Sequence, residues 1–271
     1  MRGAPGEIKK VYQIFKGFII DIEGVLIRGD TLIPPALKTI AALKRAKKRL
    51  VFLSNISDLT REEITGKLRS HGFEIDAHEV MTSAYATGLY LKERYPGKKN
   101  VFLIGTSSFK RELSNNGFTV TGDSEEAEAV VVGLDYELNY QNICAAAKAI
   151  KNGKIFIASN LAKIKLTGDG HTIGPGFTVK GLEYVTNRQA ELVGKPSKFM
   201  FEQAIGQLSL KPINVLTVGD KLEQDIYGGY AVGTRTCLVL SGAATKDDVL
   251  NQCKDYRPDY VMVDISELLE E

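Results

Sequence analysis

The chain has 271 residues, of which 44% are hydrophobic and 25% charged, which is enough apolar material for two compact domains or one large one. The net charge of +2 gives no support to a nucleic-acid or membrane partner. The three cysteines form no CxxC pair, which excludes a disulfide scaffold and fits a reducing compartment.

Residues 1–16 carry no long apolar segment and are not expected to be a secretory signal. We interpret them as an N-terminal extension. No stretch of the sequence approaches the roughly 20 apolar residues of a membrane-spanning helix. The sequence therefore predicts a cytoplasmic protein and leaves its oligomeric state open, a homo-oligomer included.

The first part of the chain alternates strands and helices. In chain order, the patterns predict a buried strand from Phe18 that ends on Asp21, a glycine-bounded flap at 24–30, a helix opened by Pro34 and Pro35, a buried strand at 50–53, and a helix from the capping box at Thr60 to about Gly72. This order predicts a parallel, right-handed, doubly wound sheet.

The pattern then restarts in a middle unit of about 100 residues, which is a plausible domain size. It predicts strands at 79–82, 101–105, 130–133 and 155–158, helices ending near 90 and at 106–116, 139–151 and 179–187, and turns at 168–171 and 174–176.

The last part returns to the style of the first. It predicts a short strand at 192–196, a buried strand at 215–220, a helix at 222–232 and strands at 237–240 and 260–263. The predicted fold class is α/β, with a Rossmann-like doubly wound parallel sheet into which the middle α/β unit is inserted.

Asp21 and Glu23 stand two residues apart where the first strand ends. On an extended chain both side chains point to the same side. Two carboxylates in one cavity repel each other unless a cation or a shared proton intervenes. The pair therefore predicts a divalent-metal site or an acid–base pair, with solvated acids after a strand as the ordinary alternative.

Four predicted strands end on polar groups, namely Asp21, Ser54, Lys195 and Asp220. Carboxyl ends of parallel strands meet at one sheet edge, so we expect these groups to lie close together, with Asp225 one helical turn beyond Asp220. Such an edge suits phosphoryl transfer, which needs cationic and hydroxyl donors, a carboxylate nucleophile and Mg²⁺. Glu23 is placed to protonate the leaving oxygen.

Each of these residues alone has a structural explanation. Asp220 suits a helix N-terminus, Ser54-Asn55 suits a turn, and Lys195 suits a solvated loop. Their joint occurrence in this order favours a site.

In these residues the chain resembles the haloacid dehalogenase-like (HAD) hydrolase superfamily, and within it the NagD-like, p-nitrophenyl phosphatase subgroup. The matching motifs are Asp21-Ile22-Glu23-Gly24-Val25, Leu53-Ser54-Asn55, Val193-Gly194-Lys195-Pro196 and Gly219-Asp220 through Asp225. Phe156 through Asn160 and Leu238 through Gly242 resemble further pieces of that subgroup, and the resemblance covers about residues 17–265.

The resemblance implies that Asp21 is the nucleophile and forms an aspartyl-phosphate. It implies Mg²⁺ bound by Asp21, the backbone carbonyl of Glu23, and Asp220, with Asp225 in support. The implied phosphate- and substrate-binding residues are Ser54, Asn55, Lys195 and Asn160. The implied domains are a catalytic core at 17–82 and 187–271 and an inserted cap at 83–186 that selects the substrate.

Two departures from the family pattern affect the expected chemistry. Glu23 stands where the family usually has a second aspartate, and one extra methylene alters the reach of an acid–base group, where misplacement can cost about 10²-fold in rate. The cap segment that commonly reads Asn-Pro-Asp is Asn160-Leu161-Ala162, followed by Lys163 and Lys165. These lysines favour an anionic leaving group, with solvated surface lysines as the alternative.

The sequence therefore predicts a Mg²⁺-dependent phosphatase of a small phosphorylated metabolite. The alternative is a weak or inactive phosphometabolite-binding protein on the same fold, in which Glu23 has cost turnover. A dinucleotide-dependent oxidoreductase is disfavoured because no G-x-G-x-x-G turn follows the first strand.

Overall fold

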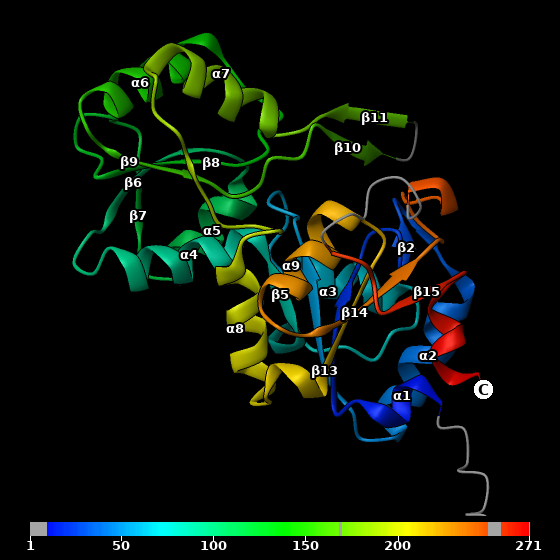
Figure 1. Ribbon diagram of the computed structural model, residues 1–271. Helices are drawn as coiled ribbons and strands as arrows, with labels where there is room; N and C mark the ends of the chain where they lie inside the picture. The colour runs from blue at the N-terminus through cyan, green and yellow to red at the C-terminus, as the bar shows by residue number, and fades with distance from the viewer. Residues whose placement is uncertain (1–9, 168–169, 249–255, 271) are drawn as a thin grey trace, which may run out of the picture. The chain divides into compact units, whose positions relative to one another are not determined.

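The computed structural model describes residues 10–167, 170–248 and 256–270 (Figure 1). They form two compact units. The first unit comprises the described residues of 1–52, 71–74 and 204–271, and the second comprises 53–70 and 75–203. A six-stranded sheet and a five-stranded sheet carry the strands of these residues, apart from two short hairpins.

A six-stranded sheet has the strand order β15-β14-β13-β1-β4-β5. Its strands are β1 (Gly17–Asp21), β4 (Arg49–Ser54), β5 (Val80–Thr82), β13 (Val215–Gly219), β14 (Arg235–Val239) and β15 (Tyr260–Met262). β1 pairs in parallel with β13, with Phe18 opposite Leu216 and Ile20 opposite Val218. Every residue of β1 and β13 is buried, as continuous apolar runs predict for a parallel sheet covered on both faces.

The helical segments of the first unit flank these strands. They are α1 (Val11–Ile14), α2 (Pro34–Arg45), the end of α8 (Lys198–Leu208), the 3-10 turns η2 (Pro212–Asn214) and η4 (Ile265–Leu269), the π-helix η3 (Leu222–Ile226) and α9 (Tyr227–Ala231). α2 begins with two prolines, buries Ile40 and Leu43, and ends on Lys44 and Arg45, where cations favour a helix C-terminus.

The second unit is built on a five-stranded sheet with the order β12-β9-β8-β6-β7. Its strands are β6 (Asn100–Ile104), β7 (Thr119–Thr121), β8 (Ala129–Val132), β9 (Ile155–Ala158) and β12 (Glu191–Leu192). Its helices are α3 (Arg61–Ser70), η1 (Ala77–Glu79), α4 (Ser83–Arg94), α5 (Ser107–Asn115), α6 (Tyr140–Lys151), α7 (Gly176–Thr186) and the first part of α8. In Figure 1, α6 and α7 cover one face of this sheet, and α4 and α5 cover the other.

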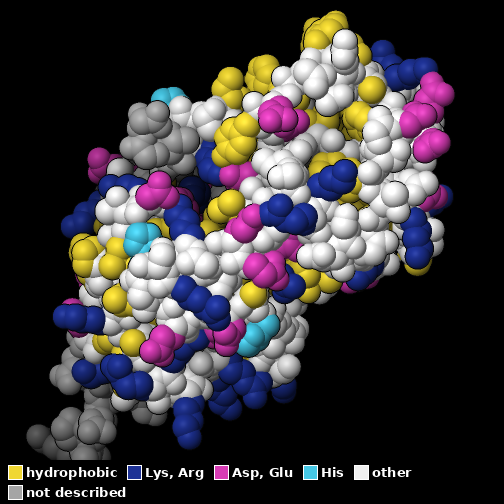
Figure 2. Space-filling view, turned by 180° about the vertical axis from the view of Figure 1, so that it is seen from behind, with side chains coloured by type: hydrophobic (Ala, Val, Ile, Leu, Met, Phe, Trp, Pro, Cys, Tyr) yellow, Lys and Arg dark blue, Asp and Glu magenta, His cyan; other side chains and the backbone are white. Residues whose placement is uncertain are grey.

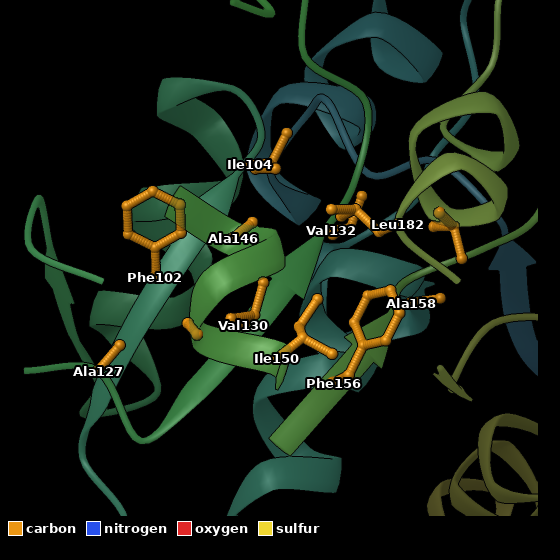
Figure 3. Packing of buried hydrophobic residues seen from close by; sticks show 12 residues of the cluster. Phe102, Ile104, Ala127, Val130, Val132, Ala146, Ile150, Phe156, Ala158 and Leu182 are labelled. Carbon is orange, nitrogen blue, oxygen red and sulfur yellow. The ribbon is translucent and has the colours of Figure 1, made fainter. Parts of the chain in front are cut away.

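The core of the second unit lies between its sheet and the pair α6 and α7. Val130 and Val132 of β8 point toward Ile150 of α6 and Leu182 of α7 (Figure 3). Phe156 of β9 closes the cluster and is 3% exposed. Close packing of this core holds the strands in place, and with them the loops that carry the polar residues.

Two short antiparallel hairpins complete the fold. β2 (Ile27–Arg28) and β3 (Thr31–Leu32) form the predicted flap after the first strand. β10 (Ile164–Thr167) and β11 (Gly170–Ile173) form a second hairpin. The sequence pattern predicted only turns there, and two of those turn residues, 168 and 169, lie outside the described residues.

The predicted α/β class with parallel sheets is confirmed. The boundaries of a core at 17–82 and 187–271 and a cap at 83–186 stay a prediction. Of the predicted extension at 1–16, residues 10–16 are described and include the single turn α1.

Two details of the prediction were wrong. The expected strand before Lys195 does not join the sheet of β1, because β12 pairs in parallel with β9, with Leu192 opposite Ala158. A short apolar run does not encode which sheet edge accepts it. The expected α-helix at 222–232 begins instead as the π-helix η3, since the amide of Ile226 reaches the carbonyl of Lys221 five residues back.

Lys and Arg side chains are interspersed with Asp and Glu side chains on the face shown in Figure 2, in keeping with the net charge of +2. Among the described residues, no helix is both long and apolar enough to cross a membrane.

Candidate active site

Three buried carboxylates meet in the first unit. Asp21 is the last residue of β1, Asp220 follows β13, and Asp225 lies in η3. One oxygen of each lies within 4.8 Å of one oxygen of the others. The three residues are 2–3% exposed, so their mutual repulsion is poorly screened by water. The arrangement therefore requires positive charge near it.

Backbone groups hold Asp220 in place. Its Oδ2 accepts a 2.7 Å hydrogen bond from the amide of Ala243. Two glycines leave room for the carboxylate, because a Cβ would lie 2.2 Å from Oδ2 at Gly24 and 2.0 Å from it at Gly242. Gly24 also has a φ of +83°, which side chains other than glycine rarely adopt. The two loops are thus shaped around one carboxylate.

Lys221 supplies part of the required positive charge. Its Nζ lies 3.4 Å from Oδ1 of Asp220. Burial alone would lower the pKa of Lys221, but the charges of Asp21, Asp220 and Asp225 outweigh it, so the pKa lies above its ordinary value. One ammonium against three carboxylates leaves net negative charge, and oxygen-only ligands suit Mg²⁺. The donor set therefore fits that ion.

The predicted acid Glu23 is tied to the flap. Its Oε1 accepts a 2.7 Å hydrogen bond from the amide of Gly29, which lies between β2 and β3. The flap is itself fixed, since Arg28 donates a 2.6 Å bond to the carbonyl of Ser241 and the Ser241 hydroxyl donates to the carbonyl of Gly24 at 2.8 Å. The position of the Glu23 carboxylate is thus set by the flap backbone.

A second group of predicted residues meets in the second unit. Oδ1 of Asn55 accepts a 2.7 Å hydrogen bond from the amide of Lys195, and Nδ2 of Asn55 donates a 3.0 Å bond to the Lys195 carbonyl. Nδ2 of Asn160 donates to the carbonyl of Asn55 at 2.9 Å. Ser54 and Lys195 are 2% and 3% exposed. This group combines a hydroxyl, two amides and an ammonium.

The basic residues of the second unit are not equivalent. Nζ of Lys165 forms an ion pair with Asp58 and donates a 3.0 Å hydrogen bond to the hydroxyl of Tyr136. Burial would lower the pKa of Lys165, but the charge of Asp58 raises it. Lys163 is exposed. The positive charge of Lys165 is therefore matched within the unit, which weakens its case as a receptor for an anionic leaving group.

The structure thus brings predicted residues together in two sets. Asp21, Asp220 and Asp225 meet in one unit, and Asn55, Asn160 and Lys195 are joined by hydrogen bonds in the other, where Ser54 directly precedes Asn55. Sequence reasoning missed Lys221, although it directly follows Asp220. It also missed Gly242, within the segment Leu238 through Gly242 that the resemblance had already marked.

Family models match both ends of the chain. A haloacid dehalogenase-like hydrolase model matches residues 18–119, and a HAD-hydrolase-like model matches 192–268. Sugar-phosphatase AraL of Bacillus subtilis is 32% identical, over 94% of this chain and 93% of its own length.

Solved structures match in fold as well as in sequence. A p-nitrophenyl phosphatase from Archaeoglobus fulgidus has a TM-score of 0.88 and 32% identity over 94% of this chain and 98% of its own. Glycerol phosphate phosphatase Rv1692 from Mycobacterium tuberculosis, solved in complex with magnesium, has a TM-score of 0.90 and 26% identity over 97% of this chain and 78% of its own.

Proposed function

The chain belongs to the haloacid dehalogenase-like hydrolase family, as the sequence motifs predicted, and we propose that it is a Mg²⁺-dependent phosphatase of small phosphomonoesters. The observation that carries the proposal is the buried cluster of Asp21, Asp220 and Asp225. The names of the relatives, which are phosphatases of sugars, glycerol phosphate and p-nitrophenyl phosphate, support the substrate class.

In this proposal Asp21, the backbone carbonyl of Glu23, and Asp220 hold Mg²⁺, with Asp225 in support. The fit of three buried carboxylates around one position supports this assignment, as does the magnesium complex of one relative. The ion, when bound, would supply positive charge that screens an anionic substrate from Asp21.

The reaction proceeds in two displacements. A carboxylate oxygen of Asp21 forms a bond to phosphorus while the bond from phosphorus to the leaving oxygen breaks, and Glu23 gives its proton to that oxygen. Glu23 then takes a proton from water. The water oxygen attacks phosphorus, the bond from phosphorus to Asp21 breaks, and phosphate is released.

Within the second group, Ser54 and Lys195 bind the phosphoryl oxygens in this proposal. Ser54 offers a hydroxyl and Lys195 an ammonium, both of which suit an anion with several oxygens. Residues 83–186 act as the cap that selects the substrate. We further propose that the enzyme works in the cytoplasm on a small phosphorylated metabolite.

The test is phosphate release from p-nitrophenyl phosphate and a panel of sugar, nucleotide, glycolate and glycerol phosphates, with Mg²⁺ and with EDTA. We expect release that requires Mg²⁺ and falls to background in Asp21→Asn. The matched control is Asp123→Asn, an exposed acid of the second unit, which should leave release unchanged. Full activity of Asp21→Asn would refute the mechanism.

The alternative of a binding protein without turnover rests only on the replacement of the usual aspartate by Glu23. The phosphatase relatives do not favour it. It would gain support if the wild-type chain bound inorganic phosphate but released none from any member of the panel.

A further inference from the structure

The side chain of Asn55 is bonded to the backbone of a residue far away in sequence. Both of its polar atoms bond to the backbone of one residue, Lys195, which lies 140 residues away in sequence. Oδ1 accepts from the Lys195 amide at 2.7 Å, and Nδ2 donates to the Lys195 carbonyl at 3.0 Å. The side-chain amide therefore pairs with the Lys195 backbone much as a neighbouring strand would.

The backbone of Asn55 is itself anchored. Its carbonyl accepts one hydrogen bond from Nδ2 of Asn160 at 2.9 Å and another from the Ser83 hydroxyl at 3.0 Å. Asn160 is 2% exposed, and its Oδ1 accepts from the amide of Ala162 at 3.0 Å. Asn160 is thus engaged on both sides with backbone, and it supports Asn55.

The chain next to Lys195 approaches this group very closely. The amide of Gly194 donates to the carbonyl of Ser159 at 2.9 Å. A Cβ on Gly194 would lie 2.3 Å from that carbonyl oxygen and 2.5 Å from Oδ1 of Asn55. The loop before Lys195 is therefore held by two elements at once, and its glycine is required by space.

The Lys195 ammonium needs such support. The residue is 3% exposed, and its Nζ lies 3.3 Å from the carbonyl of Leu53. A lysine side chain has four flexible torsions, so the position of its charge depends on where its backbone is fixed. An error of about 1 Å in a positioned group can cost about 10²-fold in rate.

We infer that Asn55 is a positioning residue for Lys195, and that Asn160 and Ser83 act through Asn55. This inference rests on the proposed function, and it changes the role first expected for Asn55 and Asn160. They place the phosphate-binding ammonium, and the ammonium binds the phosphoryl group.

A double-mutant cycle tests the inference, because residues that act through one another are not additive. The variants are Asn55→Ala, Lys195→Ala and the double variant. The readouts are kcat and KM for p-nitrophenyl phosphate with Mg²⁺, and the Kd of inorganic phosphate by calorimetry. Asn152→Ala, at the exposed C-terminal end of α6, is the matched control and should change neither.

We expect Asn55→Ala to lower kcat by tenfold or more and to weaken phosphate binding. In the Lys195→Ala background the same substitution should change both by less than twofold. An unchanged cost in that background would show that Asn55 acts on its own and would overturn the inference. Full activity and phosphate affinity in Lys195→Ala would overturn it as well.

A second variant guards against misfolding of Asn55→Ala. Ser83→Ala removes one donor to the Asn55 carbonyl without touching Lys195, and its smaller loss should also vanish in the Lys195→Ala background. Failure of the proposed function is distinguishable, since a wild-type chain without phosphate release would still show the coupling in the Kd of phosphate.

Discussion

The amide of Gly29 donates a 2.7 Å hydrogen bond to Oε1 of Glu23, so the flap between β2 and β3 holds the carboxylate that we assign as the acid. An aspartate at position 23 would be one methylene shorter. The contact with Gly29 therefore depends on the extra methylene of Glu23, which gives a structural reason for the departure from the family pattern.

Substitution of Glu23 tests this relationship. Glu23→Gln keeps an acceptor for Gly29 but cannot give or take the proton, so kcat should fall by about 10²- to 10⁴-fold with phosphate binding retained. Glu23→Asp should lose the Gly29 contact and lower kcat by up to about 10²-fold. Steady-state kinetics would measure both effects, with Glu270→Gln, a substitution of an exposed acid, as the control. A tenfold gain in Glu23→Asp would instead indicate an impaired natural enzyme.

Lys221→Met should destabilise the metal-free protein. It removes the ammonium 3.4 Å from Asp220 and leaves three buried carboxylates less compensated. Because the Lys221 side chain is 35% exposed, we expect a loss of about 1–3 kcal/mol, below that of a fully buried pair. Thermal unfolding in EDTA and in Mg²⁺ would measure it. Mg²⁺ should raise the melting temperature more in the variant than in the wild type, and equal shifts would contradict this reading.

Gly242→Ala should damage the carboxylate cluster. Its new Cβ would lie 2.0 Å from Oδ2 of Asp220, so the carboxylate or the loop must move. We expect a loss of about 1–3 kcal/mol in stability and at least a tenfold rise in the Mg²⁺ concentration for half-maximal activity. Gly206→Ala in α8 meets no atom within 4 Å and should stabilise slightly. Equal behaviour of the two variants would refute the crowding argument.

Gly194→Ala should disturb the group formed by Asn55, Asn160 and Lys195. The added methyl would press on the Ser159 carbonyl and on Asn55, displacing the loop that carries Lys195. We expect kcat to fall by about 10²-fold. Gly181→Ala in α7, where no atom lies within 4 Å, is the control. Steady-state kinetics on p-nitrophenyl phosphate would compare the two variants. Wild-type activity in Gly194→Ala would show that the close approach of Gly194 to Ser159 and Asn55 is not needed for catalysis.

Glu112 predicts a pH dependence of stability. Burial raises its pKa above the ordinary 4.5, and the nearby charges of Glu62 and Glu63 raise it further. The Arg61 charge and the 2.6 Å hydrogen bond that Oε1 of Glu112 accepts from the amide of Arg61 act in the opposite direction without cancelling the rise. A raised carboxyl pKa contributes stability that is complete below pH 4.5 and is lost as the pH rises through the folded-state value. Glu112→Gln keeps an acceptor and cannot ionise.

The melting temperature of Glu112→Gln relative to the wild type should therefore increase between pH 4.5 and pH 7. The measurement is thermal unfolding across that range, with Glu126→Gln, an exposed acid elsewhere in the second unit, as control. A difference that stays constant with pH would contradict the assignment.

The sequence by itself determined the strands at the centre of the fold and the acids at their ends. The runs that end on Asp21 and Asp220 are locally apolar and β-branched, and such runs must be buried wherever the chain takes them. Their pairing in parallel placed the two carboxylates together, as expected. The local sequence was sufficient to predict these strands, because burial and hydrophobic periodicity are properties of consecutive residues.

Only the tertiary structure decided where Lys195 and Asn55 belong. The strand before Lys195 joins β9 and not the sheet of β1, and Asn55 bonds to a residue 140 positions away. The Gly29 contact of Glu23 and the neighbours of Gly242 likewise depend on loops that fold back. Such contacts arise from the path of the chain through space, and no spacing of residues along the sequence records that path.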